Sequence, residues 1–84
     1  MKKNQDLNKV DRKILDIISH YGNLELLELC YEIGEDDALK KQILNREDAL
    51  RRLELLMAKG HVERFKDSEG ITRWALKKGE ESDQ

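Results

Sequence analysis

The sequence lacks most of the features that identify a chemistry directly. Its 84 residues include a single cysteine, Cys30, so the chain can form neither an intramolecular disulfide nor a cysteine-based zinc cluster. It contains no glycine-rich phosphate-binding loop and no serine nucleophile elbow. A chain of this length also buries too little apolar area to enclose a deep pocket. We therefore expect one small domain over residues 1–84, which is not an enzyme and uses no cofactor or metal.

Long apolar runs are missing as well. Residues 1–6 lack the apolar stretch of a signal peptide, and no run of about eighteen apolar residues occurs. The single cysteine agrees with a reducing compartment. These absences predict a cytoplasmic protein, in the cell interior or at the nucleoid, that does not associate with membranes. The ends, at residues 1–6 and 79–84, are expected to be flexible.

Charge is abundant, and its distribution matters more than its sum. Charged residues make up 40% of the chain and hydrophobic residues 38%, which fits a folded and highly charged globule. The net charge of −2 argues against a polyanionic partner, because affinity for nucleic acids comes largely from Lys and Arg. However, residues 45–79 carry nine basic and six acidic side chains, residues 1–44 carry seven and nine, and residues 80–84 carry three acids. The mildly basic C-terminal half can therefore still dock on DNA.

The first predicted helix covers residues 7–21, where apolar residues recur at helical spacing within one arc. This arc contains Leu7, Val10, Ile14, Ile17, Ile18 and Tyr21. We expect these side chains to be buried, whereas Asp11 and Leu15 lie off the arc and are expected at the surface. Asn8 is suited to cap the helix, and Gly22 is suited to end it.

Two more helices are predicted before residue 45. Residues 24–33 are apolar around most of the helix circumference, which predicts a helix packed into the core and ended by Gly34. Its polar stripe consists of Glu25, Glu28 and Glu32. We interpret that stripe as a solvated face. Asp36 can cap a short helix that runs to Ile43.

The most strongly patterned helix is predicted over residues 46–59, between Asn45 as its cap and Gly60 as its stop. Asp48, three residues after the cap, approximates a capping box. The positions expected to face the core are Ala49, Leu50, Leu53, Leu56 and Met57. The opposite face carries Glu47, Arg51, Glu54, Leu55 and Ala58.

A β-hairpin is predicted directly after this helix. Residues 62–66 and 71–76 are β-prone and are joined by the turn 67–70, which ends in glycine. Trp74 is expected to anchor the hairpin on the helices, because few other large side chains can cover it. The predicted fold class is α+β and mainly α, with three or four helices and a C-terminal hairpin.

Four segments resemble winged helix-turn-helix transcription regulators. Residues 14–22 (ILDIISHYG) resemble the first helix of that family, and residues 29–34 (LCYEIG) resemble the end of the second. Residues 49–62 (ALRRLELLMAKGHV) are similar to the recognition helix and the start of the wing, and residues 70–79 (GITRWALKKG) to its second strand. The resemblance covers nearly the whole chain. Such patterns are more specific for fold than for function.

The resemblance implies a DNA-binding transcription regulator that reads double-stranded DNA with helix 46–59 and wing 61–76. The side chains implied as DNA contacts are Arg46, Arg51, Arg52, Lys66 and Arg73. The arginines of the helix also suit surface ion pairs, such as Glu47 with Arg51 and Asp48 with Arg52. The two hairpin cations equally suit charges that protect an edge strand.

Two departures from the family pattern keep alternatives open. Residues 34–45 form a longer spacer than the usual tight turn, so either a short helix is inserted or the helix pair is 36–43 with 46–59. The pole of helix 46–59 that would face the groove also carries Glu47, Asp48 and Glu54 beside Leu55. This acidic pole and the acidic total favour the alternative function of a winged-helix protein-protein interaction module. Such a module would be an accessory subunit of a replication, transcription or trafficking assembly. Leu15 and Leu55, both off their buried arcs, predict a homodimer.

Overall fold

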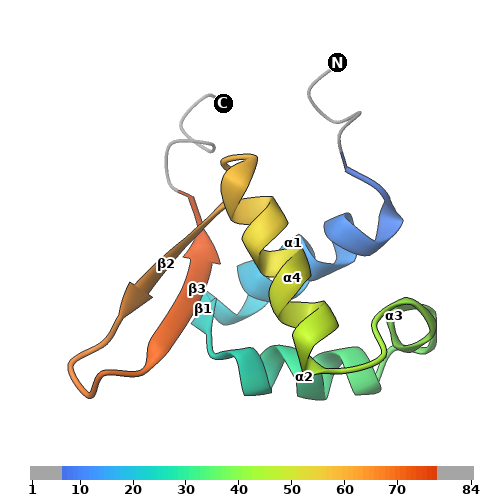
Figure 1. The fold of residues 1–84 in the computed structure, drawn as a ribbon, viewed down its shortest axis with the longest axis horizontal. Helices are drawn as coiled ribbons and strands as arrows, with labels where there is room; N and C mark the ends of the chain where they lie inside the picture. The colour runs from blue at the N-terminus through green and yellow to red at the C-terminus, as the bar shows by residue number, and fades with distance from the viewer. Residues whose placement is uncertain (1–6, 78–84) are drawn as a thin grey trace.

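The computed structural model describes residues 7–77, and the flexible ends expected at residues 1–6 and 79–84 lie outside that range. Four helices and a three-stranded antiparallel sheet form a small, mainly helical α+β domain (Figure 1). In chain order the elements are α1 (Lys9–Tyr21), β1 (Asn23–Leu24), α2 (Leu26–Gly34), α3 (Asp37–Gln42), α4 (Arg46–Ala58), β2 (Val62–Lys66) and β3 (Thr72–Leu76). No helix within this range has the length and apolar character that crossing a membrane requires.

Helix α1 is held by the cap and the stop that its sequence predicted. The Asn8 side chain accepts a hydrogen bond from the Asp11 N–H at 2.9 Å, which satisfies a free donor of the first turn. Gly22 has a φ of 82°, a left-handed conformation that favours glycine, and donates its N–H to the Ile18 carbonyl at 2.9 Å. The chain therefore turns sharply out of α1 into β1.

The acids of α2 are more than a solvated face, contrary to the prediction. Glu25 and Glu28 form a capping box, in which the Glu28 carboxylate accepts from the Glu25 N–H at 2.9 Å. The Glu32 carboxylate accepts a hydrogen bond from the Tyr21 hydroxyl at 2.7 Å. The helix ends at Gly34 as predicted, although Gly34 does not have a positive φ.

The long spacer between α2 and α4 contains the short helix α3. Asp36 caps α3 as predicted, because its carboxylate accepts from two backbone N–H groups of the first turn at 3.0 Å. Asn45 caps α4 by accepting from the Asp48 N–H at 2.9 Å. The Asp48 carboxylate accepts from the Leu44 N–H at 3.2 Å, so the predicted reciprocal bond is made one residue earlier.

The hairpin pairs as predicted, and it gains a third strand that the sequence did not predict. Strands β2 and β3 are antiparallel, with Lys66 opposite Thr72. The two-residue strand β1 pairs with the other edge of β3, placing Leu24 opposite Trp74 and giving the order β1-β3-β2. The central strand β3 is therefore bonded on both sides and joins the hairpin to the N-terminal half.

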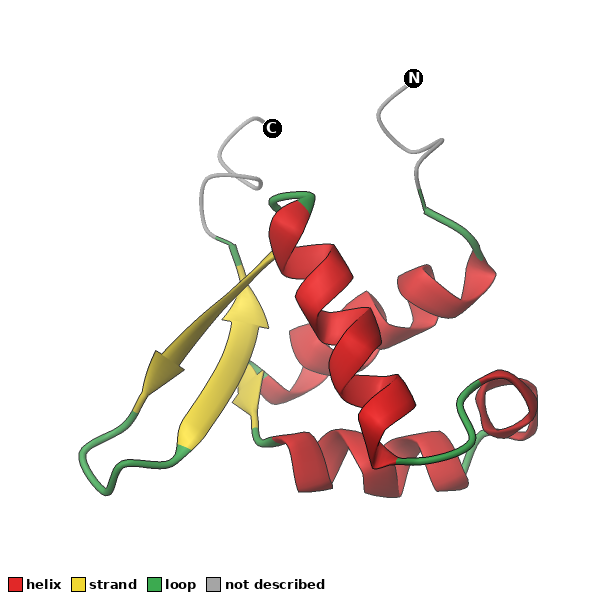
Figure 2. Cartoon of the chain, viewed as in Figure 1, coloured by secondary structure: helices red, strands yellow, loops and turns green. Residues whose placement is uncertain are grey.

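One hydrophobic core joins the helices to the sheet, and Figure 2 shows the strands gathered at one side of the helices. Its buried members are Ile14, Ile18, Leu24, Leu29, Ile33, Leu39, Ile43, Ala49, Leu53, Leu56, Val62 and Trp74. Trp74 is 2% exposed and anchors the hairpin as predicted. The core is thus completed by one large side chain from the central strand.

Three surface and burial expectations for α1 were wrong. Tyr21 is 41% exposed, because its ring lies over the surface where the hydroxyl reaches Glu32. Asp11, expected at the surface, is only 6% exposed. Leu15 packs partly buried against the core. Of the two leucines expected to support a homodimer, only Leu55 is well exposed.

We expect Leu53→Ala to lower the free energy of unfolding by about 2–5 kcal/mol, because it opens a cavity at a fully buried position of α4. Leu55→Ala, at an exposed position of the same helix, should change it by no more than about 0.5 kcal/mol. Urea unfolding monitored by circular dichroism measures both. Equal effects of the two substitutions would contradict the packing of α4 described here.

Candidate nucleic-acid interface

The outer face of α4 is open over its length, and Figure 1 shows this helix crossing in front of α1. The residues predicted on that face, Glu47, Arg51, Glu54, Leu55 and Ala58, are all exposed. Their side chains therefore meet whatever docks on α4. The face is of mixed charge, because it carries two acids and one arginine.

A shallow cleft of about 430 Å³ lies between α4 and the hairpin. Arg64 and Lys66 of β2 line it from the hairpin, and Glu54 lines it from α4. The Arg64 guanidinium carbon lies 5.5 Å from the centroid of the Trp74 ring, a cation–π arrangement that holds the arginine over the sheet. Neither cation forms an ion pair with another residue of the range 7–77. Both charges are therefore available to an anion in the cleft.

Arg51 forms a surface ion pair, although with a different partner from the one expected. Its Nη1 donates to Asp48 Oδ1 at 2.9 Å rather than to Glu47. The pKa of Asp48 is lowered first by the Leu44 N–H and then by this arginine. The Arg51 side chain is 65% exposed, and an ion pair so open to water contributes only about 0.2–1 kcal/mol. Exchange of Asp48 for a phosphate would therefore cost little.

Arg52 connects two helices instead of pairing with Asp48. Its Nη1 donates to Asp11 Oδ1 of α1 at 3.3 Å, and the two side chains are 28% and 9% exposed. This pair explains why an acid lies at the edge of the core. Because loss of the arginine would leave a nearly buried carboxylate unpaired, Arg52 serves the packing of α4 on α1.

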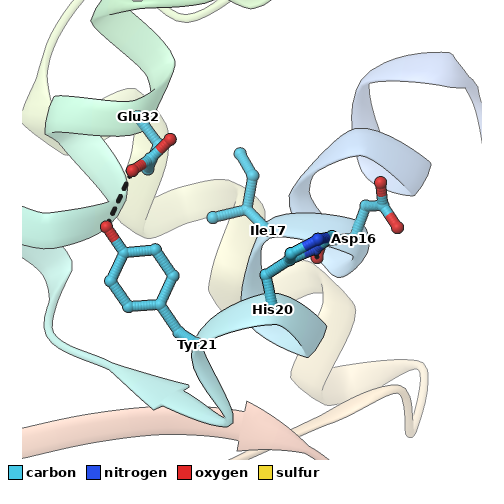
Figure 3. Close-up of a pocket in the computed structure, with 5 residues that line it drawn as sticks. All are labelled: Asp16, Ile17, His20, Tyr21 and Glu32. Carbon is cyan, nitrogen blue, oxygen red and sulfur yellow. Dashed lines mark hydrogen bonds between the residues drawn. The ribbon is translucent and has the colours of Figure 1, made fainter.

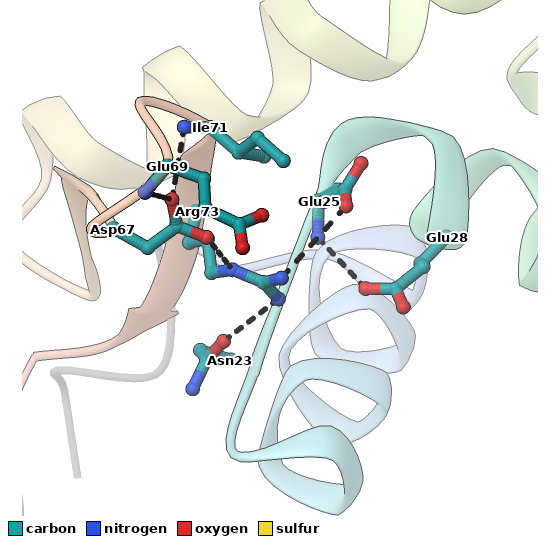
Figure 4. Close-up of polar contacts among 7 residues, drawn as sticks. All are labelled: Asn23, Glu25, Glu28, Asp67, Glu69, Ile71 and Arg73. Atoms are coloured by element: carbon teal, nitrogen blue, oxygen red, sulfur yellow. Dashed lines mark hydrogen bonds and ion pairs between the residues drawn. The ribbon is translucent and has the colours of Figure 1, made fainter.

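Arg73 ties the turn of the hairpin to the N-terminal half (Figure 4). Its Nε donates to Asp67 Oδ2 at 3.0 Å and its Nη1 donates to Asn23 Oδ1 at 3.1 Å. Its Nη2 lies 3.8 Å from Glu25 Oε2. The pKa of Arg73 is raised, chiefly by the hydrogen bond to Asp67. One guanidinium therefore joins β3, the turn, β1 and the cap of α2.

The five predicted DNA contacts do not lie together. Side chains alternate along a strand, and Arg73 is opposite Phe65 whereas Lys66 is opposite Thr72, so Arg73 and Lys66 face opposite sides of the sheet. Arg46 lines a groove beside α2, away from the cleft of Lys66. Of the five, Arg51 and Lys66 lie on the open α4 and hairpin surfaces.

Sequence reasoning did not select Arg64. Its position was nevertheless readable, because it lies two residues before Lys66 in a predicted strand and therefore on the same face. It is exposed and lines the same cleft. The two-residue periodicity of a strand would therefore have placed Arg64 beside Lys66 on one face of the hairpin.

A second surface pocket, of about 540 Å³, lies between α1 and α2 (Figure 3). Asp16, His20, Tyr21 and Glu32 line it around Ile17. The hydrogen bond to Glu32 raises the pKa of Tyr21. Among residues 7–77, no group of three or more His, Cys, Asp or Glu side chains is arranged to hold a metal ion.

Comparison with protein-family models, with curated proteins and with solved structures finds no match to this chain. The residues and their geometry are therefore the basis for assigning a function.

The turn of the hairpin should respond to acid. The pKa of Asp67 is lowered, first by the Ile71 N–H and then by the Arg73 guanidinium. A carboxyl with a lowered folded pKa stabilises the protein above the ordinary value of about 3.9, and this contribution is lost as the pH falls through the folded pKa. Asp67→Asn keeps the acceptor oxygen but not the charge. The slope of unfolding free energy against pH below about pH 4 should therefore be shallower in the variant. An unchanged acid limb in urea titrations would contradict the contact.

Proposed function

We propose that this chain is a winged helix-turn-helix protein that binds double-stranded DNA and regulates transcription. The order of its elements supports the fold: three helices precede a fourth, α4, which is followed through Gly60 by a β-hairpin. The resemblance of the sequence to this family covers the same elements. A small domain acting on DNA without chemistry would regulate by occupying its site.

One observation carries the proposal. Arg64 and Lys66 line the cleft beside α4, and neither has an ion-pair partner within residues 7–77. Arg51 adds a third cation, held only by an exposed pair. In this arrangement α4 meets the major groove while the two hairpin cations meet phosphates along its edge.

The other three candidate residues take different roles in the proposal. Arg52 holds α4 to α1 through Asp11, and Arg73 holds the hairpin to the N-terminal half through Asn23 and Glu25. Arg46 lies beside α2. The contact set is therefore small, and affinity for DNA should be modest and dependent on salt.

A second candidate function is that of a winged-helix protein-interaction module, an accessory subunit of a larger assembly. The observation that favours it is the composition of the outer face of α4. Glu47 and Glu54 are exposed there beside Leu55, which is 51% exposed. Carboxylates repel phosphate, and an exposed leucine suits an apolar pocket of a protein.

Salt dependence of duplex binding separates the two functions. Log affinity should fall with log salt concentration at a slope of about −0.9 per phosphate contact, or about −2.7 when Arg51, Arg64 and Lys66 each contact a phosphate. Arg64→Ala with Lys66→Ala should make this slope shallower by about 1.8. Fluorescence anisotropy with a labelled random duplex, measured over a salt series, gives both slopes.

The matched control is Lys9→Ala with Arg12→Ala. It removes the same charge from exposed positions of α1, which form no ion pair with other residues in the described range. Its slope should equal that of the unaltered protein. If both double variants lose the same slope, the cleft is not the contact. If the unaltered protein shows no duplex binding at low salt, DNA binding is wrong and the interaction module is favoured.

Glu54 should oppose DNA from within the cleft. Glu54→Gln removes its charge and keeps its shape, so duplex affinity should rise by about two- to fivefold. Asp16→Asn is the control, because Asp16 is an exposed acid on α1. The same anisotropy assay at low salt compares them. A fall in affinity on Glu54→Gln would instead mark the carboxylate as a base contact and contradict simple repulsion.

A further inference from the structure

The largest exposed apolar side chains gather beside α2. Among the described residues, Leu44 is 74% exposed, Tyr31 65% and Leu27 61%, more than any other large hydrophobic side chain in that range. Leu27 and Tyr31 are one helical turn apart, so they form a ridge along one side of α2. Leu44 lies in the connection between α3 and α4. Side chains so open to water imply a surface that is covered by a partner.

A groove lies between the ridge and this connection. It has a volume of about 660 Å³, and Leu27, Cys30 and Ile33 line it from α2. Ile43, Leu44 and Arg46 line its other side. A ridge and a groove are therefore adjacent on one surface. Such a surface can fit a copy of itself, because the ridge of one molecule can enter the groove of the other.

The two chain segments beside the groove differ in charge, although the α2 side of the groove is uncharged and its other side carries Lys40, Arg46 and Glu47. Residues 25–35 carry four carboxylates and no cation, whereas residues 40–46 carry three cations and no carboxylate. No ion pair crosses between the two segments in the structure of residues 7–77. Glu35 and Arg46 are exposed on opposite sides. Lys40 pairs with Asp37, and Glu25 pairs with Arg73. Glu35, Lys41 and Arg46 form no ion pair within residues 7–77, so these charges remain for an electrostatic match with another molecule.

We infer that this surface joins two copies of the chain about a two-fold axis. The acidic α2 of each copy packs against residues 40–46 of the other, so the charge match is made twice. Leu27, Tyr31 and Leu44 of both copies are buried at the centre. A second copy of the chain carries both an acidic segment and a cationic segment, so it can match both charged segments of the first copy at the same time. On the outer face of α4, Arg51, Glu54, Leu55 and Ala58 do not line this groove, whereas Glu47 lies at its edge.

The first test is self-association of the full chain without nucleic acid, so its outcome is independent of duplex binding. Sedimentation velocity over a concentration series should show a monomer–dimer equilibrium. Leu44→Asp should raise the dissociation constant by more than about tenfold, because it places a charge in the apolar centre of both halves. Leu55→Asp is the matched control at an exposed leucine of α4, and it should leave the dissociation constant unchanged.

The second test reverses the charges on each side. The first variant is Glu32→Lys with Glu35→Lys, and the second is Lys40→Glu with Arg46→Glu. Each variant alone places like charges in contact and should be monomeric, whereas an equimolar mixture restores both matches and should form a heterodimer. Circular dichroism verifies that each variant is folded.

Three results would overturn the inference. A chain that stays monomeric at every concentration would leave the surface to a different partner. A dimer that survives Leu44→Asp, or that is lost with Leu55→Asp, would use another face. Folded charge-reversed variants that fail to form a heterodimer would show that residues 25–35 and 40–46 do not meet across the contact.

Discussion

The burial of Trp74 is the contact on which the rest of the structure depends. This side chain lies on the central strand, between Leu24 of β1 and Arg64 of β2, and is 2% exposed. It is the largest side chain in a core that is otherwise aliphatic, so it supplies much of the apolar area that fixes the hairpin on the helices. The hairpin, once fixed, sets the position of the cleft beside α4. The arrangement of cations there follows from this single packing contact.

Local sequence signals predicted most of the fold. Caps at Asn8, Asp36 and Asn45, and the glycine turns at Gly22, Gly60 and Gly70, depend on a few neighbouring residues, so each could be read from the chain. Strand β1 could not be read in this way, because two residues have no periodicity and are ordered only by pairing with β3.

The candidate site was less predictable, because two of its arginines form hydrogen bonds with residues far away in the sequence. Arg52 reaches Asp11 across 41 positions, and Arg73 reaches Asn23 across 50. Helical spacing predicted an ion pair between Asp48 and Arg52, but in the structure Asp48 pairs with Arg51. An arginine on a surface pattern can bind a partner or hold the fold, and only the three-dimensional arrangement separates the two. Apolar periodicity carries no information about that choice.

The cation–π contact between Arg64 and Trp74 gives the molecule a built-in optical reporter. Trp74 is the only tryptophan of the chain, and the guanidinium above its ring belongs to the cleft. Indole emission is sensitive to nearby charge and to water, so any event that withdraws Arg64 from the ring changes the intrinsic fluorescence. Occupation of the cleft can thus be followed without a label, in the same sample in which unfolding exposes the same ring.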